Sequence, residues 1–191
     1  MNVLLFDDLF STICLYFNIK DIINFELIST YHHRLIRKTT SFLPVLIRNE
    51  TSLKHIIQNY HFKNLLFKSS VNVNLYLDYL KNCHMLDLAY TNINDESVKE
   101  LKYCHKLNLS GTKITDNGLK WLTNCHTLYL YGTWITDEGV SKLNCHILDL
   151  SSTNITDEGI KAFKNRRLYL CHTKVTQDCK NLLKRNGCQI H

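Results

Sequence analysis

Proline and tryptophan are scarce in this sequence, and long apolar runs are missing. One proline and two tryptophans occur among 191 residues. No apolar run approaches the roughly 18 residues that a membrane-spanning helix needs. The first six residues run directly into Asp7 and Asp8 without a basic segment or a long apolar segment, which argues against a secretory signal peptide. We therefore expect an intracellular protein, in the cytoplasm or the nucleus, that does not contact a membrane.

Acidic residues are fewer than basic ones. The sequence has 17 Asp and Glu against 23 Lys and Arg, a formal net charge of +6. So small an excess is typical of a solvated basic surface and does not favour nucleic acid as a partner. The alternative is a nucleic-acid site in the basic stretch that contains Arg34, Arg37, Lys38 and Arg48. The eight cysteines are expected to be reduced thiols in an intracellular protein.

An internal repeat of 20 or 21 residues dominates the rest of the sequence. Cys-His pairs begin at Cys83, Cys104, Cys125 and Cys145, and each opens the phrase Cys-His-x-Leu-x-Leu-x-x-Thr-x-Ile. A fixed period of this length is typical of a solenoid. The paired leucines are Leu86/Leu88, Leu107/Leu109, Leu128/Leu130, Leu148/Leu150 and Leu168/Leu170.

The repeated phrase predicts a strand and a short helix in each unit. The Leu-x-Leu alternation places both leucines on one side of a strand, so the x residues face the other side. A phrase such as Thr136-Asp137-Glu138-Gly139 is typical of a helix start, because threonine caps an amide and acidic residues suit the helix dipole. One unit cannot bury its leucines alone. We therefore expect an α/β solenoid in which stacked units form a parallel strand ladder with a spacing of about 4.8 Å.

The first third of the chain predicts short helices instead. Leu9, Ile13 and Phe17 recur as on one helix face, while Asp21 and Ser29 can cap two further helices. The expected division is a helical domain over residues 1–42, a helical linker or joint over 43–64, and the solenoid over 65–191. Within the solenoid we expect a degenerate unit over 65–82, regular units over 83–103, 104–124, 125–144 and 145–164, and a C-terminal cap over 165–191.

Both parts resemble a known family. The phrase Leu-x-Leu-x-x-Thr-x-Ile-Thr-Asp-x-Gly resembles the cysteine-containing leucine-rich repeats of F-box proteins. The segments Leu5-Phe6-Asp7-Asp8-Leu9 and Ile28-Ser29-Thr30-Tyr31 resemble an F-box, with Phe6 where that family has proline. The resemblance implies a leucine-rich-repeat solenoid with a parallel strand ladder, preceded by a small three-helix F-box-like domain.

The same resemblance implies a substrate-recognition adaptor of a ubiquitin ligase. Members of the family dock the F-box on a Skp-type adaptor, which links them to a cullin–RING ligase, and bind a target protein with the repeats. Their contribution is proximity, not catalysis. A free-standing protein–protein interaction module without a ligase role is the alternative. The residues implied to bind the adaptor are Leu5, Phe6, Leu9, Ile13, Ile22, Ile28 and Tyr31.

The outward x positions of the strands are the expected surface for the target protein, whose identity the sequence does not reveal. Tyrosine, tryptophan and arginine are favoured as anchors of protein interfaces, and several occur at or just after these positions. The candidate target-binding residues are Asp87, Lys106, Asn108, Tyr129, Tyr131, Trp134, Asp149, Arg167 and Tyr169.

The Cys-His pairs favour packing over metal binding. Adjacent residues of an extended segment point to opposite sides, so a cysteine and its histidine do not converge on one ion. We expect a buried column of thiols and an outer column of histidines that forms a solvated edge. A pH-dependent anion site on this column is the alternative, because neighbouring imidazolium groups repel one another. No nucleophile elbow, phosphate loop or metalloprotease helix is present in the sequence. The protein is therefore expected to be no enzyme and to use no cofactor or metal.

Overall fold

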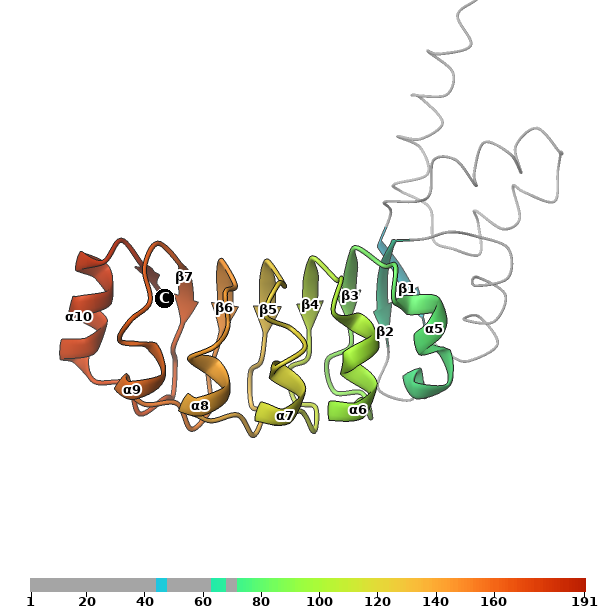
Figure 1. The fold of residues 1–191 in the computed structure, drawn as a ribbon, viewed down its shortest axis with the longest axis horizontal. Helices are drawn as coiled ribbons and strands as arrows, with labels where there is room; N and C mark the ends of the chain where they lie inside the picture. The colour runs from blue at the N-terminus through green and yellow to red at the C-terminus, as the bar shows by residue number, and fades with distance from the viewer. Residues whose placement is uncertain (1–43, 48–62, 68–71) are drawn as a thin grey trace, which may run out of the picture.

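A computed structural model describes residues 44–47, 63–67 and 72–191 of the chain (Figure 1). Within these residues, eight parallel strands form one sheet, and their order in space is their order in the chain. The predicted helices of residues 1–42 lie outside the described residues. The strands are β1 (Pro44–Ile47), β2 (Asn64–Phe67), β3 (Met85–Asp87), β4 (Lys106–Asn108), β5 (Thr127–Tyr129), β6 (Ile147–Asp149), β7 (Arg167–Tyr169) and β8 (Gln189–Ile190).

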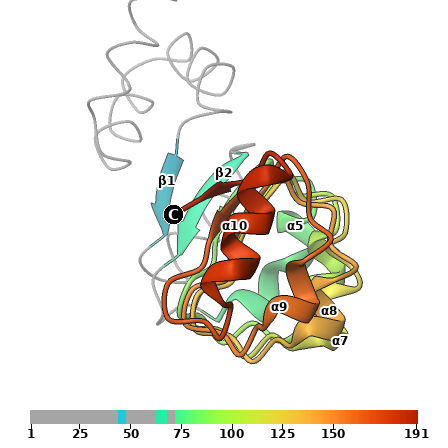
Figure 2. The same cartoon turned by 90° about the vertical axis from the view of Figure 1, so that its left-hand side faces the viewer.

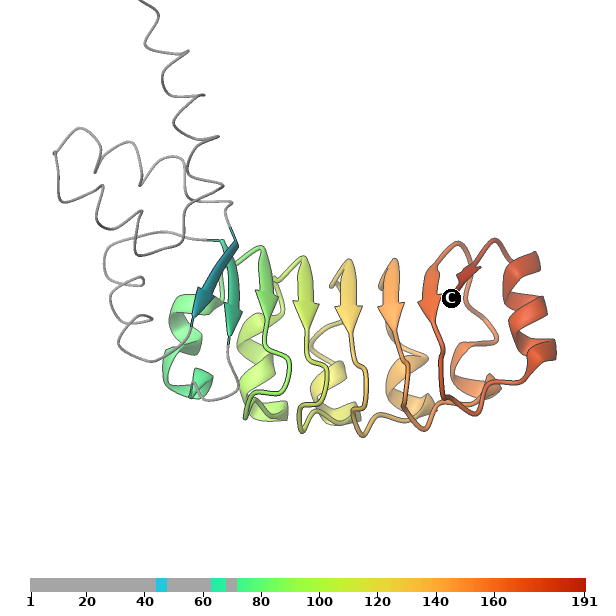
Figure 3. The ribbon, with the colours of Figure 1, turned by 180° about the vertical axis from the view of Figure 1, so that it is seen from behind.

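From β2 onward, short helices return the chain from one strand to the next and lie together on one side of the sheet (Figures 1 and 3). Seen along the stack, successive coils superimpose closely (Figure 2). None of the helices in the described ranges has the length and hydropathy to cross a bilayer. The α-helices are α5 (Leu77–Leu80), α6 (Asp95–Val98), α7 (Asp116–Leu119), α8 (Asp137–Val140), α9 (Asp157–Ile160) and α10 (Gln177–Arg185), and the 3₁₀ helices are η2 (Val73–Tyr76) and η3 (Lys99–Leu101).

The leucines of the repeat form the shared core, as the Leu-x-Leu pattern predicts. Leu86 pairs in register with Leu107 and Leu107 with Leu128, and all three side chains are fully buried. The second leucine of each pair, such as Leu109, is buried as well. The repeat fold with a parallel ladder is therefore confirmed for the described part of the chain.

One strand lies outside the predicted solenoid. Residues 44–47, assigned above to a helical linker, form β1, which pairs with β2 at an offset of 20 residues (Pro44 with Asn64). The sheet therefore begins a full coil earlier than the expected start at Leu65. The segment Pro44-Val45-Leu46-Ile47 lacks the Leu-x-Leu alternation, because apolar residues occupy consecutive positions.

Buried threonine hydroxyls close the turns after strands β3 to β6. Oγ1 of Thr112 donates to the carbonyl of Leu109 at 2.6 Å, and Oγ1 of Thr133 donates to the carbonyl of Leu130 at 2.7 Å. Both threonines are buried. A buried hydroxyl without a partner is destabilising, so the local carbonyl explains why the repeat tolerates a polar residue here.

Aspartates link each coil to the next through what we call the Asp–Thr bridges. Asp95 accepts hydrogen bonds from both the amide (2.8 Å) and the hydroxyl (2.6 Å) of Thr115, one coil later. Asp137 binds Thr156 in the same way, at 2.8 and 2.6 Å. The full set is Asp95–Thr115, Asp116–Thr136, Asp137–Thr156 and Asp157–Thr176.

The bridges correct the predicted role of Thr136 as a helix cap. Thr136 does occupy the residue before α8, but its side chain makes no capping bond and its hydroxyl donates to Asp116 instead. Thr115 and Thr156 combine the two roles, because each also accepts an amide of its own helix at 3.3 Å. The main role of the threonine is therefore to link neighbouring coils, and capping of its own helix is the secondary role.

Glycine in α7, α8 and α9 makes room for the bridging aspartate of the preceding coil. A Cβ atom on Gly139 would collide with the carboxylate of Asp116, and one on Gly159 with that of Asp137. Where the first coil has Asn74 in place of the aspartate, Ser97 replaces the glycine and its hydroxyl donates to the Asn74 side chain. The glycine is thus a requirement of packing between coils.

Candidate functional site

The outward face of the sheet, which we call the sheet face, carries the strand residues that alternate with the buried leucines. Lys106, Asn108 and Tyr129 are half-buried on this face, on either side of Leu107 and after Leu128. The strand alternation and the in-register ladder together fix these side chains in rows across the coils. Figure 3 shows the strands from this side.

One pocket of about 340 Å³ opens on the sheet face over strands β2 to β5. Within it, Nζ of Lys106 lies 5.6 Å from the ring centroid of Tyr129, a cation–π contact that holds both side chains in place. The lining combines an apolar floor with one ammonium, one carboxylate, one amide and one phenol. It consists of Leu66, Met85, Leu86, Asp87, Lys106, Asn108 and Tyr129.

Three of the predicted target-binding residues also have a structural role. Oδ1 of Asp87 accepts the amide of Ala89 at 3.1 Å, and Asn108 accepts from Ser110 at the same distance. Asp149 makes the equivalent bond at 2.9 Å. These bonds shape the turn at the end of each strand. They also fix the side chains that face a ligand, which reduces the entropy lost on binding.

The remaining predicted residues are not brought into this pocket. Nε of Arg167 donates to the side chain of Gln189 at 3.0 Å, and Tyr169 stacks on His191 with ring centroids 4.8 Å apart. Both pairs lie at the C-terminal end of the sheet, over β7 and β8. Tyr131 and Trp134 follow β5 in the next turn, and Trp134 is one of the most exposed apolar side chains in the described residues, at 79%.

The prediction missed the apolar part of the pocket. Leu66, Met85 and Leu86 line it, but none of them was selected as a target-binding residue. Leu66 lies 21 residues before Asp87 and pairs with it in register, so the repeat itself contained the signal. It was missed because the unit that contains Leu66 departs from the repeated phrase.

The cysteines of the repeat form the predicted internal column, and their histidines lie outside. Cys83, Cys104, Cys125 and Cys145 are buried, with at most 4% of each side chain exposed. Burial raises the pKa of Cys83 to about 11 and that of Cys145 to about 12. Such thiols are poor nucleophiles at neutral pH. No group of three or more potential metal ligands converges within the part of the chain that the structure describes.

The architecture is an α/β repeat fold of the leucine-rich-repeat type: a parallel ladder of short strands, buried leucines and compact helical returns. The sequence model of the family described as Leucine Rich repeat matches residues 105–122 and 146–164. Both matched segments begin at a histidine of the repeated Cys-His pairs, His105 and His146. Residues 1–42 are not part of this match.

Solved structures with the same type of fold were found at low sequence identity. Internalin C2 from Listeria monocytogenes is 17% identical, with 84% of this chain and 74% of that chain covered and a TM-score of 0.54, which shows the fold alone. A plant ice-binding protein (14% identity, 74% and 52% covered) and a TDR receptor (14%, 78% and 30%) give TM-scores of 0.48 and 0.46. No match was found among curated proteins.

Proposed function

We propose that this chain is a non-catalytic binding module that holds a protein partner on its sheet face. The pocket over β2 to β5 is the observation that supports this most directly, because it combines an apolar floor with the oriented side chains of Lys106, Tyr129 and Asp87. An apolar pocket with a few fixed polar groups is typical of a binding site. Nothing in the lining has the arrangement of a nucleophile and base.

Substitutions in the pocket test this proposal in the full-length protein. Tyr129→Ala removes the aromatic wall and Lys106→Ala the cation above it, while Lys113→Ala, in an exposed turn outside the pocket, is the matched control. Partners captured by proximity labelling in cells should be depleted about tenfold with either pocket variant, the loss expected for an interface anchor. Equal capture by all three variants would exclude the pocket as the binding site.

A finer form of the proposal makes the chain an adaptor of a Skp–cullin–F-box ubiquitin ligase. Its support is the sequence resemblance of residues 1–42 to an F-box, together with the repeats that follow. The residues implied to bind a Skp-type adaptor, among them Leu9 and Ile13, lie outside the described residues. A cytoplasmic location goes with this proposal, and the free thiols of the repeat suit a reducing compartment.

Direct binding to a purified Skp-type adaptor tests the finer proposal. Full-length protein should retain the adaptor, and Leu9→Glu or Ile13→Glu should abolish retention, whereas Lys20→Ala should not. Circular dichroism of each variant checks that the repeats remain folded. If wild-type protein with folded repeats fails to retain the adaptor, the alternative is favoured: a free-standing protein–protein interaction module without a ligase role.

A further inference from the structure

The two edges of the coil carry different charges, although the linear sequence interleaves them. The acidic residues at the starts of the helices lie together on one edge, the aspartate edge: Asp95, Glu96, Asp116, Asp137, Glu138, Asp157 and Glu158. The opposite edge, where the chain enters the strands, has no Asp or Glu within residues 79–86, 101–108, 121–128, 141–148 and 161–168. We call it the histidine edge, after His84, His105, His126 and His146.

The carboxylates of the aspartate edge find their hydrogen-bond and ion-pair partners within the solenoid. Each bridging aspartate accepts two hydrogen bonds from the threonine of the next coil, and Glu96, Glu138 and Glu158 pair with Lys99, Lys142 and Lys161. On the histidine edge, by contrast, the side chains of Lys81, Lys102 and Lys164 enter none of the ion pairs found among the described residues. This edge therefore presents positive charge that the coil itself does not neutralise.

The imidazoles of the histidine edge form a continuous exposed stack. Ring centroids of His84 and His105 are 4.7 Å apart, those of His105 and His126 are 4.6 Å apart, and the planes differ by only 10° and 15°. His146 continues the row at 5.2 Å with a tilt of 34°. All four side chains are exposed. The result is a straight line of nitrogen-bearing rings parallel to the solenoid axis.

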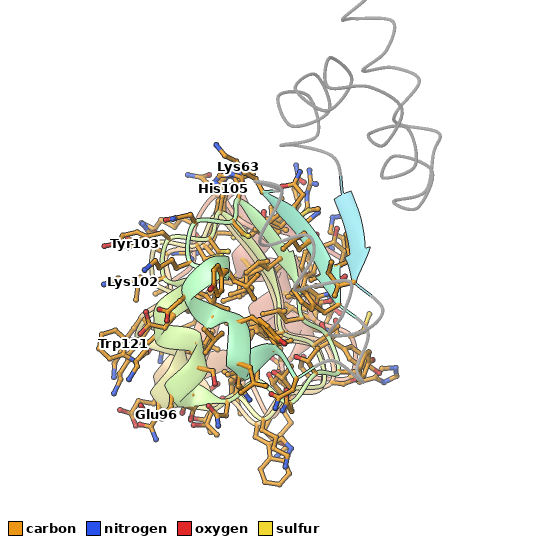
Figure 4. All side chains as sticks on the ribbon, turned by 90° about the vertical axis from the view of Figure 1, so that its right-hand side faces the viewer. Lys63, Glu96, Lys102, Tyr103, His105 and Trp121 are labelled. Carbon is orange, nitrogen blue, oxygen red and sulfur yellow. The ribbon has the colours of Figure 1, made fainter. Side chains whose placement is uncertain are left out.

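Two exposed aromatic side chains lie on the flank between this row and the aspartate edge, Tyr103 nearer the row and Trp121 nearer Glu96, and each has a lysine over its ring. Tyr103, 75% exposed, has Nζ of Lys102 at 5.1 Å, and Trp121, 41% exposed, has Nζ of Lys120 at 5.3 Å. Figure 4 shows His105 at one end of this flank and Glu96 at the other, with Tyr103, Lys102 and Trp121 between them. The row beside the histidines is completed by the exposed amides of Asn82, Asn124 and Asn144.

From these placements we infer that the histidine edge binds single-stranded nucleic acid, with phosphates along the imidazole and lysine rows and a base stacked on Tyr103. Backbone-tracking positive charge combined with aromatic platforms is the arrangement that binds single strands without sequence preference. An acidic peptide would use the cations but would leave the exposed aromatic rings without a role. The inference concerns a different surface from the proposed protein-binding pocket.

Stacked imidazoles make such binding dependent on pH. The pKa of His126 lies below its usual value, because of partial burial and of the neighbouring His105 and His146. A phosphate chain along the row offsets this repulsion, so binding takes up protons and tightens as the pH falls. Within residues 79–86, 101–108, 121–128, 141–148 and 161–168, the other charged side chains are cations, among them Lys102, Lys106 and Arg166. The thiols of Cys83, Cys104, Cys125 and Cys145 are neutral, because burial raises the pKa of each.

Fluorescence anisotropy on the full-length protein tests the inference. The probes are fluorescein-labelled oligothymidine and oligouridine of about 20 nucleotides, a length that covers one or more typical binding sites. Affinity for both should rise about tenfold between pH 7.5 and pH 5.5 at constant ionic strength. The salt dependence should steepen at pH 5.5, by about 0.7 in the logarithmic slope for each added phosphate contact.

Matched variants distinguish binding at the histidine edge from nonspecific electrostatic attraction to the whole protein. His105→Gln combined with His126→Gln removes the centre of the imidazole row and should abolish most of the gain in affinity between pH 7.5 and pH 5.5. Tyr103→Ala should weaken binding about tenfold at both pH values, the loss expected for one stacked base. His191→Gln makes the same chemical change outside the row. It should alter neither the affinity at pH 7.5 nor the affinity at pH 5.5. Far-UV circular dichroism establishes that each variant is folded.

Three results would overturn the inference. One is the absence of measurable binding of either probe at pH 5.5 in low salt. Another is an equal loss of affinity in the His191→Gln control and in the double variant. The last is a pair of findings: an oligoglutamate peptide of equal charge competes as strongly as unlabelled oligothymidine, and Tyr103→Ala has no effect on affinity. Together they would assign the edge to an acidic protein segment.

Discussion

The aspartate edge and the histidine edge come from the same repeat, yet the repeated polar side chains of the first link the coils by hydrogen bonds and those of the second do so by ring stacking. Asp137 on the aspartate edge binds the amide and the hydroxyl of Thr156 in the next coil. On the other edge, the backbones of His105 and His126 are hydrogen-bonded, but their side chains meet across coils as stacked rings. The comparison teaches that periodic polar residues can be a structural device on one edge and an available surface on the other. Their hydrogen-bond partners distinguish the two cases.

The largest effect is expected from breaking one Asp–Thr bridge. Asp137→Ala removes both acceptors of Thr156, and we expect it to lower the free energy of unfolding by about 1–3 kcal/mol. Glu138→Ala, the next residue, removes only the exposed ion pair with Lys142 and should change it by less than about 0.5 kcal/mol. Urea titration measures both. Equal losses of unfolding free energy in the two variants would show that the Asp–Thr bridge does not stabilise the protein.

A smaller loss of stability is expected when the pH is lowered into the range where Asp157 titrates. Hydrogen bonds from the hydroxyl and the amide of Thr176 lower the pKa of Asp157 below its usual value. The bridge is therefore fully stabilising above the pKa of the unfolded chain, near 3.8, and its contribution is lost as the pH falls through the lower pKa of the folded state.

Asp157→Asn removes that ionisation, so the variant should lose less stability than wild type between about pH 5 and pH 2.5. Thermal melts across this range measure the difference. The control is Asp178→Asn, an exposed acid in the first turn of α10. If wild type and Asp157→Asn had parallel pH profiles, the carboxylate of Asp157 would not be titrating in the bridge.

The smallest effect is expected on the histidine edge. His126→Gln should leave the free energy of unfolding at pH 7.5 within about 0.5 kcal/mol of wild type, because the side chain is exposed. The lowered pKa of His126 means that the unfolded chain binds protons more readily, so wild type loses stability as the pH falls through about 6.5.

The glutamine variant lacks this loss and should be slightly more stable than wild type at pH 5.5. Urea titrations at both pH values measure the crossover. His191→Gln again provides the control. A variant that is much less stable at pH 7.5 would show that the imidazole stack holds the coils together, and the contrast between the two edges would disappear.

Most of the fold could be predicted because its signal is local. The Leu-x-Leu alternation and the spacing of 20 or 21 residues give the strands, their parallel register and the buried column of cysteines. The start of the sheet could not be predicted in this way. β1 at Pro44–Ile47 pairs correctly with β2 but lacks the alternation, since an end strand is held by its neighbour and not by its own pattern.

The polar interactions were harder to predict because their partners belong to different coils. Thr136 and Asp137 are adjacent in sequence, which favours a local helix cap, but Thr136 binds Asp116 one coil before and Asp137 binds Thr156 one coil after. The separation of charge between the edges is hidden for the same reason. Acidic and basic segments alternate along the chain, and the two kinds lie on separate edges only in the folded solenoid.

The geometry of the candidate site follows in part from the sequence. The alternation places Asp87, Lys106, Asn108 and Tyr129 on the outward side of their strands, and these four residues line one pocket. It could not show that Arg167 and Tyr169 are engaged by β8 and its following residue, because those contacts depend on the terminal coil. Periodicity shows which side of a strand a residue occupies, but not which neighbours it meets there.

The pairing of bridge and glycine also bears on how such a chain changes length during evolution. Every interior coil offers a carboxylate to the following coil and a glycine-lined space to the preceding one, so a duplicated coil fits between any two others without further substitutions. The two ends differ: Ser97 faces Asn74 at one, and the thiol of Cys179 meets Asp157 at the other. Insertions and deletions of whole units should therefore be tolerated between these two residues and selected against beyond them.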